Sequence, residues 1–293
     1  MRPRRPHFFS LFLALTAFGT ITAHAAPLRI VAAENVYGDV ARQIGGPDVE
    51  VASVLNNPDQ DPHLFETSPA VLRQLADAQV VIYNGADYDP WMPKLLAATP
   101  RPGRVTIVAA ELTGKRTGDN PHLWYDPATM PAVARVIADA FAKADPAHAA
   151  DYRTRLTTFL AALKPLDDKI DVIRKKFSGA PVTASEPVFG YMASALGLVM
   201  RNDRFQIAIM NDTEPAARDV AAFERDLKAH RVRVMFFNAQ ALDKIVQHLV
   251  ALARENKVPV VGVTELVPPG QSFQSWMLNE LNETEKALAG PSS

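Results

Sequence analysis

Short apolar runs alternate with amphipathic segments along most of the chain. The runs LRIVAAE, VEVASVL, AQVVIYNG and GRVTIVAA are rich in β-branched residues, and each precedes a segment with helical spacing of its apolar positions. The same alternation returns after residue 179 in PVTASE, RVRVMFFN and VPVVGVTE. Such alternation is typical of βα units on a parallel sheet. We therefore expect an α/β protein with two lobes, each a parallel sheet with flanking helices.

A long helical pattern lies between these two sets of strands. In residues 145–178 the apolar side chains recur at steps of three and four, and Asp145 is expected to cap the helix. A helix of this length would span roughly 50 Å, and Pro165 should bend it. We predict one long connecting helix between an N-terminal lobe, 26–144, and a C-terminal lobe, 179–293. The alternative is two helices, broken at the proline, inside one larger domain.

The first residues have the features of a secretory signal peptide. A basic start is followed by an apolar run over about residues 8–17 and by the small-x-small pattern Ala23-His24-Ala25. The apolar run is shorter than the ~20 residues that a membrane span needs. We expect residues 1–25 to be removed and the mature protein to be exported.

Composition narrows the classes further. The chain has no cysteine, which excludes disulfides, thiolate metal sites, a cysteine nucleophile and a lipid-modified N-terminal cysteine. Export without a lipid anchor favours the periplasm. The 31 basic and 32 acidic side chains form no basic cluster, so nucleic acid is not an expected partner. We expect a protein with no membrane anchor.

Two similar segments place a histidine directly after a proline. DPHLFE contains His63 and NPHLWYD contains His122, and each segment follows a predicted strand. Proline fixes its own backbone angle and restricts the preceding residue, so both histidines leave from stiff turns. Loops beyond the carboxyl ends of parallel strands are where ligand groups gather in open α/β sheets. The two histidines are therefore either simple turn residues or two parts of one site.

The second half of the chain offers two acids at comparable positions. Glu186 and Glu265 each stand just beyond a predicted strand, where an acid can also be a helix cap or a surface charge. Imidazole and carboxylate together suit a divalent first-row metal, namely Mn²⁺, Fe²⁺ or Zn²⁺. Asp61, Glu66 and Asp126 lie near the histidines and are candidates either for holding the imidazole rings or for ordinary turn positions.

A series of segments in this order resembles the metal-binding subunits of ABC importers, the zinc, manganese and iron class of solute-binding proteins (periplasmic cluster A-I type). The segments are DPHLFETSPAVLRQLADAQVVIYNG, GADYDPWMPKLL, NPHLWYDPATM, SEPVFGYMASALGL, MNDTEPAARDVAAFERDLKAHRVRVMFFN and GVTELVPPGQSFQSWM. The resemblance implies two α/β lobes joined by one long helix, with a metal ion between them. It places the ligands on His63, His122, Glu186 and Glu265. It also implies a permease and its ATPase as partners, and we expect a monomer.

Two features of the sequence bear on the metal. The ligand position that Glu186 occupies here is held by histidine in many zinc-transporting members of that class and by glutamate in many manganese- or iron-transporting ones. The histidine-rich loop of many zinc members is missing before His122. Both features favour manganese or iron, while zinc stays open because it usually binds the same ligands more tightly. The last ligand is more often aspartate than glutamate, so Glu265 departs from the pattern.

These observations predict a periplasmic binding protein that captures a divalent metal and delivers it to a membrane permease, without catalysing a reaction. The rival is a metal-dependent hydrolase that uses the same histidine and glutamate cluster to activate water. The chain has neither a His-Glu-x-x-His nor a Gly-x-Ser-x-Gly motif. Four protein ligands would also leave no open position of the kind that catalytic zinc keeps. A surface adhesin, a label sometimes given to this class, is disfavoured by the missing lipidation cysteine.

Overall fold

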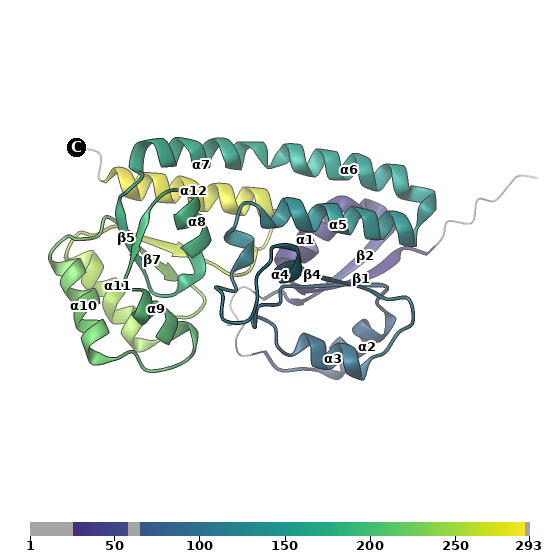
Figure 1. The fold of residues 1–293 in the computed structure, drawn as a ribbon, viewed down its shortest axis with the longest axis horizontal. Helices are drawn as coiled ribbons and strands as arrows, with labels where there is room; N and C mark the ends of the chain where they lie inside the picture. Colours follow the sequence, from purple (N-terminus) through teal and green to yellow (C-terminus); the bar gives the residue numbers. More distant parts are fainter. Residues whose placement is uncertain (1–25, 58–64, 291–293) are drawn as a thin grey trace, which may run out of the picture.

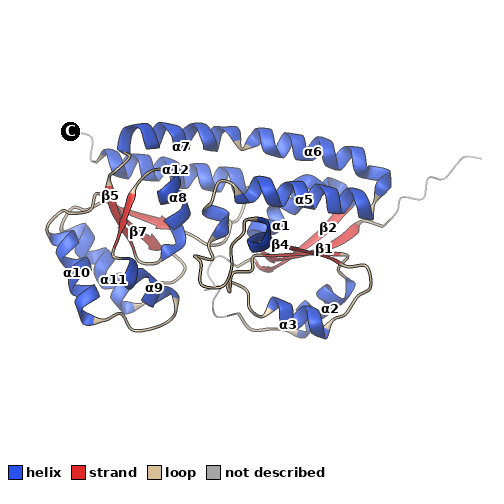
Figure 2. Cartoon of the chain, in the orientation of Figure 1, coloured by secondary structure: helices blue, strands red, loops and turns tan. Residues whose placement is uncertain are grey.

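The chain folds into two lobes, each built on a four-stranded parallel sheet. The computed structural model describes residues 26–57 and 65–290. The strand order is β2-β1-β3-β4 in the first sheet and β6-β5-β7-β8 in the second, and every neighbouring pair is parallel. The two sheets lie side by side, with helices on both faces of each (Figure 2). The predicted two-lobe α/β fold is thus confirmed.

The elements alternate in both lobes as the apolar pattern predicts. The first lobe contains β1 (Leu28–Glu34), α1 (Asn35–Gly45), β2 (Val49–Leu55), α2 (Pro69–Asp77), β3 (Val80–Tyr83), α3 (Met92–Ala98), β4 (Val105–Val108), α4 (Ala109–Leu112) and α5 (Thr129–Ala144). The second lobe contains β5 (Pro181–Ala184), α8 (Gly190–Ala195), β6 (Val199–Arg201), α9 (Asp203–Met210), α10 (Ala217–Lys228), β7 (Met235–Asn238), α11 (Lys244–Glu255), β8 (Val260–Val263) and α12 (Phe273–Ala289).

Alternate residues of the first sheet enter different layers of the core. Ile30 and Ile82 face the main cluster, which includes α1 and α5, whereas Val31 and Val81 face a smaller cluster with α2 and α3. This period of two is what strands buried on both faces require. The central strands therefore read as nearly continuous apolar runs in the sequence.

The second sheet is buried in the same way. Met235 packs with α9, α10 and α11, while the next residue, Phe236, packs into the cluster shared with α8 and α12. The main apolar cluster is continuous from β1 to α12 and contains residues of both lobes. A continuous core of this kind gives the lobes a fixed relative position rather than a loose hinge.

The connecting segment consists of two helices, α6 (Ala149–Ala162) and α7 (Lys164–Phe177), which follow one another along the top of both lobes (Figure 1). The break falls where Pro165 enters the first turn of α7, because proline has no N–H for the preceding turn. The expected long bent connector is confirmed. The expected helix cap at Asp145 is not observed. A 3₁₀ turn, Pro146–His148, precedes α6, and the Asp145 side chain makes no capping bond there.

Direct hydrogen bonds also join the lobes. The Asn35 side chain donates to the carbonyl oxygen of Val267 and accepts from its N–H, both at 2.9 Å. The side-chain amides of Gln43 and Gln274 form a reciprocal pair, again with both distances 2.9 Å. These bonds join α1 both to the segment between β8 and α12 and to the first turn of α12. Among the described residues no helix is long and apolar enough to cross a membrane.

Candidate metal centre

The predicted ligands in the described part of the chain all follow strands of the two sheets. The strand order in each sheet reverses between its two central strands, β1 and β3 in the first lobe and β5 and β7 in the second. Ligand groups gather at the carboxyl ends of strands near such a reversal. Glu186 follows β5 by two residues, Glu265 follows β8 by two, and His122 lies on the segment between α4 and α5. The topology thus brings these side chains to one junction between the lobes.

His63 lies outside the described residues, so its part in the site stays a prediction. Within the described ranges, no three His, Cys, Asp or Glu side chains are close enough together to hold a metal ion by themselves. The geometry below therefore concerns the surroundings of His122, Glu186 and Glu265 one by one.

His122 faces Glu265 across the lobe boundary. The His122 Nε2 atom is 3.5 Å from Glu265 Oε2, and both side chains are fully buried. The other ring nitrogen, Nδ1, lies 2.8 Å from Asn120 Oδ1. Because an amide oxygen only accepts, Nδ1 carries a hydrogen in this contact, which leaves Nε2 as the nitrogen available to a metal ion. Nε2 has no hydrogen-bond partner among the described residues. A buried imidazole oriented in this way is prepared to bind a metal ion.

Glu265 is fixed by donors from both lobes. The Tyr88 hydroxyl donates to Oε2 at 2.6 Å, and the Asn238 side-chain amide donates to Oε1 at 2.5 Å. The backbone N–H of Glu265 in turn donates to Gln240 Oε1 at 2.6 Å. Burial, followed by the charge of Glu265, raises the pKa of Tyr88 well above its ordinary value, so the phenol keeps its proton and acts as a donor. These neutral donors hold the carboxylate in place without cancelling its charge.

Glu186 lies next to the same amide group. Its side chain is buried, and Asn238 Nδ2 is 3.5 Å from its Oε1 atom. The backbone N–H of Asn238 donates to Ser185 Oγ at 3.1 Å, which fixes the end of β7 against the segment that carries Glu186. Asn238 therefore stands between the two predicted carboxylate ligands. The sequence interpretation missed it, although a polar residue closing the apolar strand RVRVMFFN was a visible signal.

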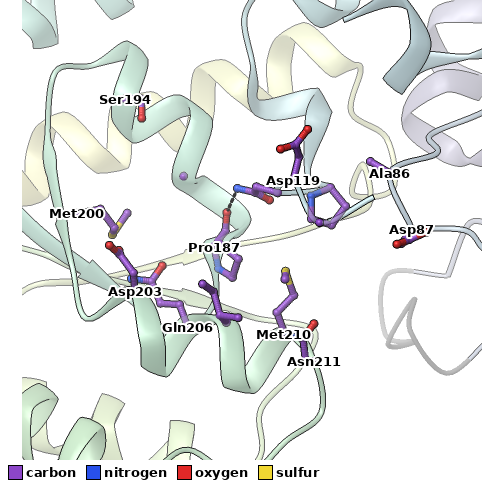
Figure 3. A pocket seen from close by; sticks show the side chains of 15 residues that line it. Ala86, Asp87, Asp119, Pro187, Ser194, Met200, Asp203, Gln206, Met210 and Asn211 are labelled. Carbon is purple, nitrogen blue, oxygen red and sulfur yellow. Dashed lines mark hydrogen bonds between the residues drawn. The ribbon is translucent and has the colours of Figure 1, made fainter. Parts of the chain in front are cut away.

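Asn120 connects the histidine to the other lobe. Its side-chain amide donates to the carbonyl oxygen of Pro187 at 2.7 Å, and Tyr191 OH donates to its backbone oxygen at 2.8 Å. The bond to Pro187 appears as a dashed line in Figure 3. One residue thus orients His122 and also contacts the residue that follows Glu186.

A cavity of about 590 Å³ lies between the lobes beside this junction, with Asn120 and Pro187 in its wall. Figure 3 shows the exposed acids Asp87, Asp119 and Asp203 around it. A hollow lined by charges of one sign raises the local concentration of ions of the opposite sign. The approach to the junction therefore favours cations.

Asp126 was open to two interpretations, a partner of the imidazole ring or a turn residue, and its contact fits the turn residue. The Oδ1 atom of Asp126 accepts the N–H of Ala128 at 3.0 Å. Asn120 takes the position at the ring instead. Glu66 is exposed, and Asp61 lies outside the described residues.

Comparison with known proteins agrees with this architecture. The family described as "Zinc-uptake complex component A periplasmic" matches residues 30–287. The iron ABC transporter substrate-binding lipoprotein MtsA of Streptococcus pyogenes serotype M1 is 22% identical over 309 residues, covering 96% of each chain. The periplasmic zinc-binding protein TroA of Treponema pallidum superimposes with a TM-score of 0.76 at 18% identity, covering 90% of this chain and 99% of TroA.

A second solved structure, the substrate-binding protein FpvC of Pseudomonas aeruginosa in complex with Mn²⁺, gives a TM-score of 0.74 at 19% identity and covers 90% of this chain and 98% of FpvC. Nothing in these comparisons supports a hydrolase. Since the family match extends over most of its length, the chain belongs to the zinc-uptake complex component A family of periplasmic metal-binding proteins, which are substrate-binding components of ABC importers and not enzymes.

Proposed function

We propose that the mature protein, formed by removal of residues 1–25, captures one divalent transition metal ion between its lobes in the periplasm. The ion would be held by His63, His122, Glu186 and Glu265 and delivered to a membrane permease driven by an ATPase. The observation that carries this proposal is the buried Nε2 atom of His122, which faces the Glu265 carboxylate at 3.5 Å and has no hydrogen-bond partner among the described residues.

Electrostatics supports a cation at this position. The carboxylates of Glu186 and Glu265 are both buried and share the Asn238 amide group, so negative charge is held in a place where burial makes it unfavourable. A divalent ion would balance both carboxylates, and such charge matching favours ion binding over an organic ligand at the same place. The donors Asn238 and Tyr88 can remain bonded to the carboxylates while their other lone pairs turn to the ion.

The choice of metal rests on the chemistry of the ligands. Two carboxylates and two imidazoles suit Mn²⁺ or Fe²⁺, and the glutamate at position 186 favours these over zinc. Relatives of the chain are described as binding iron, zinc or manganese. We therefore propose Mn²⁺ or Fe²⁺ first and Zn²⁺ close behind, because zinc binds most such ligand sets more tightly.

Release would proceed through local movement rather than wide opening of the lobes. The bonds of Asn35 to Val267 and of Gln43 to Gln274 hold the lobes together close to Glu265. Metal ligands must also be deprotonated, so binding should release protons and weaken as the pH falls. A metal-free structure with widely separated lobes would contradict this route.

Calorimetric titration of the metal-stripped mature protein with Mn²⁺ and Zn²⁺ tests the proposal. We expect one-to-one binding that is lost in His63→Ala, His122→Ala and Glu186→Ala. His248→Ala is a matched control, because this histidine is exposed and pairs with Glu224 on the second lobe. No binding of either ion to the unaltered protein, or equal loss in the control, would refute the proposal.

A further inference from the structure

An uncommon backbone turn precedes the tyrosine that contacts Glu265. Gly85, Ala86 and Asp87 are three consecutive residues with positive φ, at 76°, 52° and 64°. The left-handed region is unfavourable for residues with a Cβ atom, so Ala86 and Asp87 need outside support to remain there. Backbone strain of this kind concentrates at functional sites, where the surroundings hold it in place.

Asp89 supplies that support. Its Oδ2 atom accepts the N–H of Asn84 at 2.7 Å, and its Oδ1 atom accepts the N–H of Gly85 at 2.8 Å. A hydrogen bond from the N–H of Tyr88 to the carbonyl oxygen of Gly85, at 3.1 Å, closes the turn. One carboxylate with both oxygens occupied thus spans the start of the turn from inside the core, where Asp89 is 1% exposed.

The position of Asp89 is also distinctive, because it lies beside the buried Glu34 at the end of β1. Neither carboxyl oxygen of Glu34 has a hydrogen-bond partner of ordinary geometry among the described residues. Burial, and secondarily the charge of Asp89, raises the pKa of Glu34 well above its ordinary value. Burial raises the pKa of Asp89 to about 6, which leaves it ionised at neutral pH. Of these two neighbouring acids, Asp89 is the one that receives the backbone donors.

The turn determines where the Tyr88 side chain goes. The Tyr88 ring packs edge-on against Trp124, with centroids 4.9 Å apart, and against His122 at 5.9 Å. From there its hydroxyl reaches Glu265 of the other lobe at 2.6 Å. A change in the turn would move the tyrosine away from the carboxylate without removing any predicted ligand.

We propose that Asp89 is a positioning residue of the metal site: by holding the left-handed turn at residues 85–87 it aims Tyr88 at Glu265 and so sets the orientation of that carboxylate. This inference rests on the proposed function. Asp89 touches no metal ion itself and acts through Tyr88. Its removal should therefore weaken metal binding only while the tyrosine hydroxyl is present.

A double-mutant cycle tests this dependence. We expect Asp89→Asn and Tyr88→Phe each to weaken Mn²⁺ binding by roughly 10–100-fold, the range typical of groups that orient metal ligands. We expect the double variant to bind no more weakly than Tyr88→Phe alone, because the two residues act in series. Losses that simply multiply in the double variant would overturn the proposal.

Two further variants separate positioning from general loss of stability. Asp226→Asn removes another buried aspartate, which pairs with Arg201 in the second lobe; it should lower the melting temperature and leave metal affinity unchanged. Ala86→Gly should raise the melting temperature, because glycine accepts the left-handed conformation without strain. Combined with Asp89→Asn, it should restore folding and part of the metal affinity. A combined variant that folds but regains no affinity would contradict the proposed role of the turn.

A readout without metal keeps this inference distinct from the proposed function. Tyr88 is only 4% exposed, so tetranitromethane should leave it unmodified in the unaltered protein and nitrate it in Asp89→Asn, as seen by peptide mass spectrometry. Asp226→Asn should leave Tyr88 protected. Equal protection of Tyr88 from nitration in Asp89→Asn and in Asp226→Asn would refute the positioning role. Failure of the unaltered protein to bind any metal would refute the proposed function alone.

Discussion

Replacing Glu280 with glutamine should make the free energy of unfolding less sensitive to rising pH. Glu280 is buried on α12 and accepts from Trp276 Nε1 at 2.8 Å and from the N–H of Thr264 at 3.2 Å. The Tyr125 hydroxyl lies 2.7 Å both from Glu280 and from the Thr264 carbonyl oxygen, yet it has one hydrogen. A protonated Glu280 resolves this conflict, because it donates to the tyrosine oxygen while the tyrosine donates to Thr264. Glutamine can reproduce that pattern without a titrating proton.

The magnitude follows from the pKa. Burial raises the pKa of Glu280 from 4.5 to about 8. The folded protein therefore holds a proton that the unfolded chain has already lost, and stability falls as the pH rises from 4.5 to about 8. One pKa unit is worth about 1.4 kcal/mol, so the full penalty is about 5 kcal/mol, of which about 3 kcal/mol accrues between pH 5 and pH 8.

Urea denaturation of the unaltered protein and of Glu280→Gln at several pH values between 5 and 9 measures this difference. Other buried acids affect both proteins equally, so the difference between them isolates Glu280. The free energy of unfolding of the variant should exceed that of the unaltered protein by a margin that grows with pH and levels off above pH 8. Parallel curves would show that Glu280 is not protonated when buried, and the reasoning would fail.

Three other outcomes are expected. Asn238→Ala should lower the free energy of unfolding by about 1–3 kcal/mol, because it removes a hydrogen-bond donor from the buried Glu265 and Glu186. Urea denaturation with and without Mn²⁺ measures this loss, which should be smaller when the metal is bound. Asn35→Ala breaks both bonds to Val267 and should lower the free energy of unfolding by about 1–3 kcal/mol. It should also speed metal release, measured by stopped-flow chelator competition, and an unchanged release rate would mean that these bonds do not restrain the lobes. Metal affinity measured by calorimetry should fall steadily from pH 7.5 to pH 5.5, and a flat profile would exclude imidazole ligands.

The architecture was predictable because each element leaves its own local pattern. Apolar runs with β-branched residues and the helical spacing of 145–178 identify strands and connector without any knowledge of distant contacts. The break between α6 and α7 was expected as a bend at Pro165 in one long helix, with two helices inside one larger domain as the alternative. The cap at Asp145 was mistaken because the sequence does not show that this carboxylate binds His148 at 2.6 Å instead.

The surroundings of the site were harder to predict. Glu265 could be proposed from its place after a strand, but Tyr88, Asn120 and Asn238 reach it or His122 only through tertiary contacts. Such supporting residues have no fixed spacing from the groups that they orient, so no motif identifies them. Asn120 and Asp126 show the difficulty: both flank the histidine, only Asp126 was proposed as a partner of the ring, and only the folded turn decides that Asn120 faces it.

The most direct test of a shared site is anomalous X-ray diffraction from crystals grown with Mn²⁺. The account predicts one strong peak between the lobes, bonded to His122 Nε2 and to carboxylate oxygens of Glu186 and Glu265 at about 2.0–2.3 Å, with His63 completing the set. A peak away from His122, or ligands drawn from a single lobe, would contradict it.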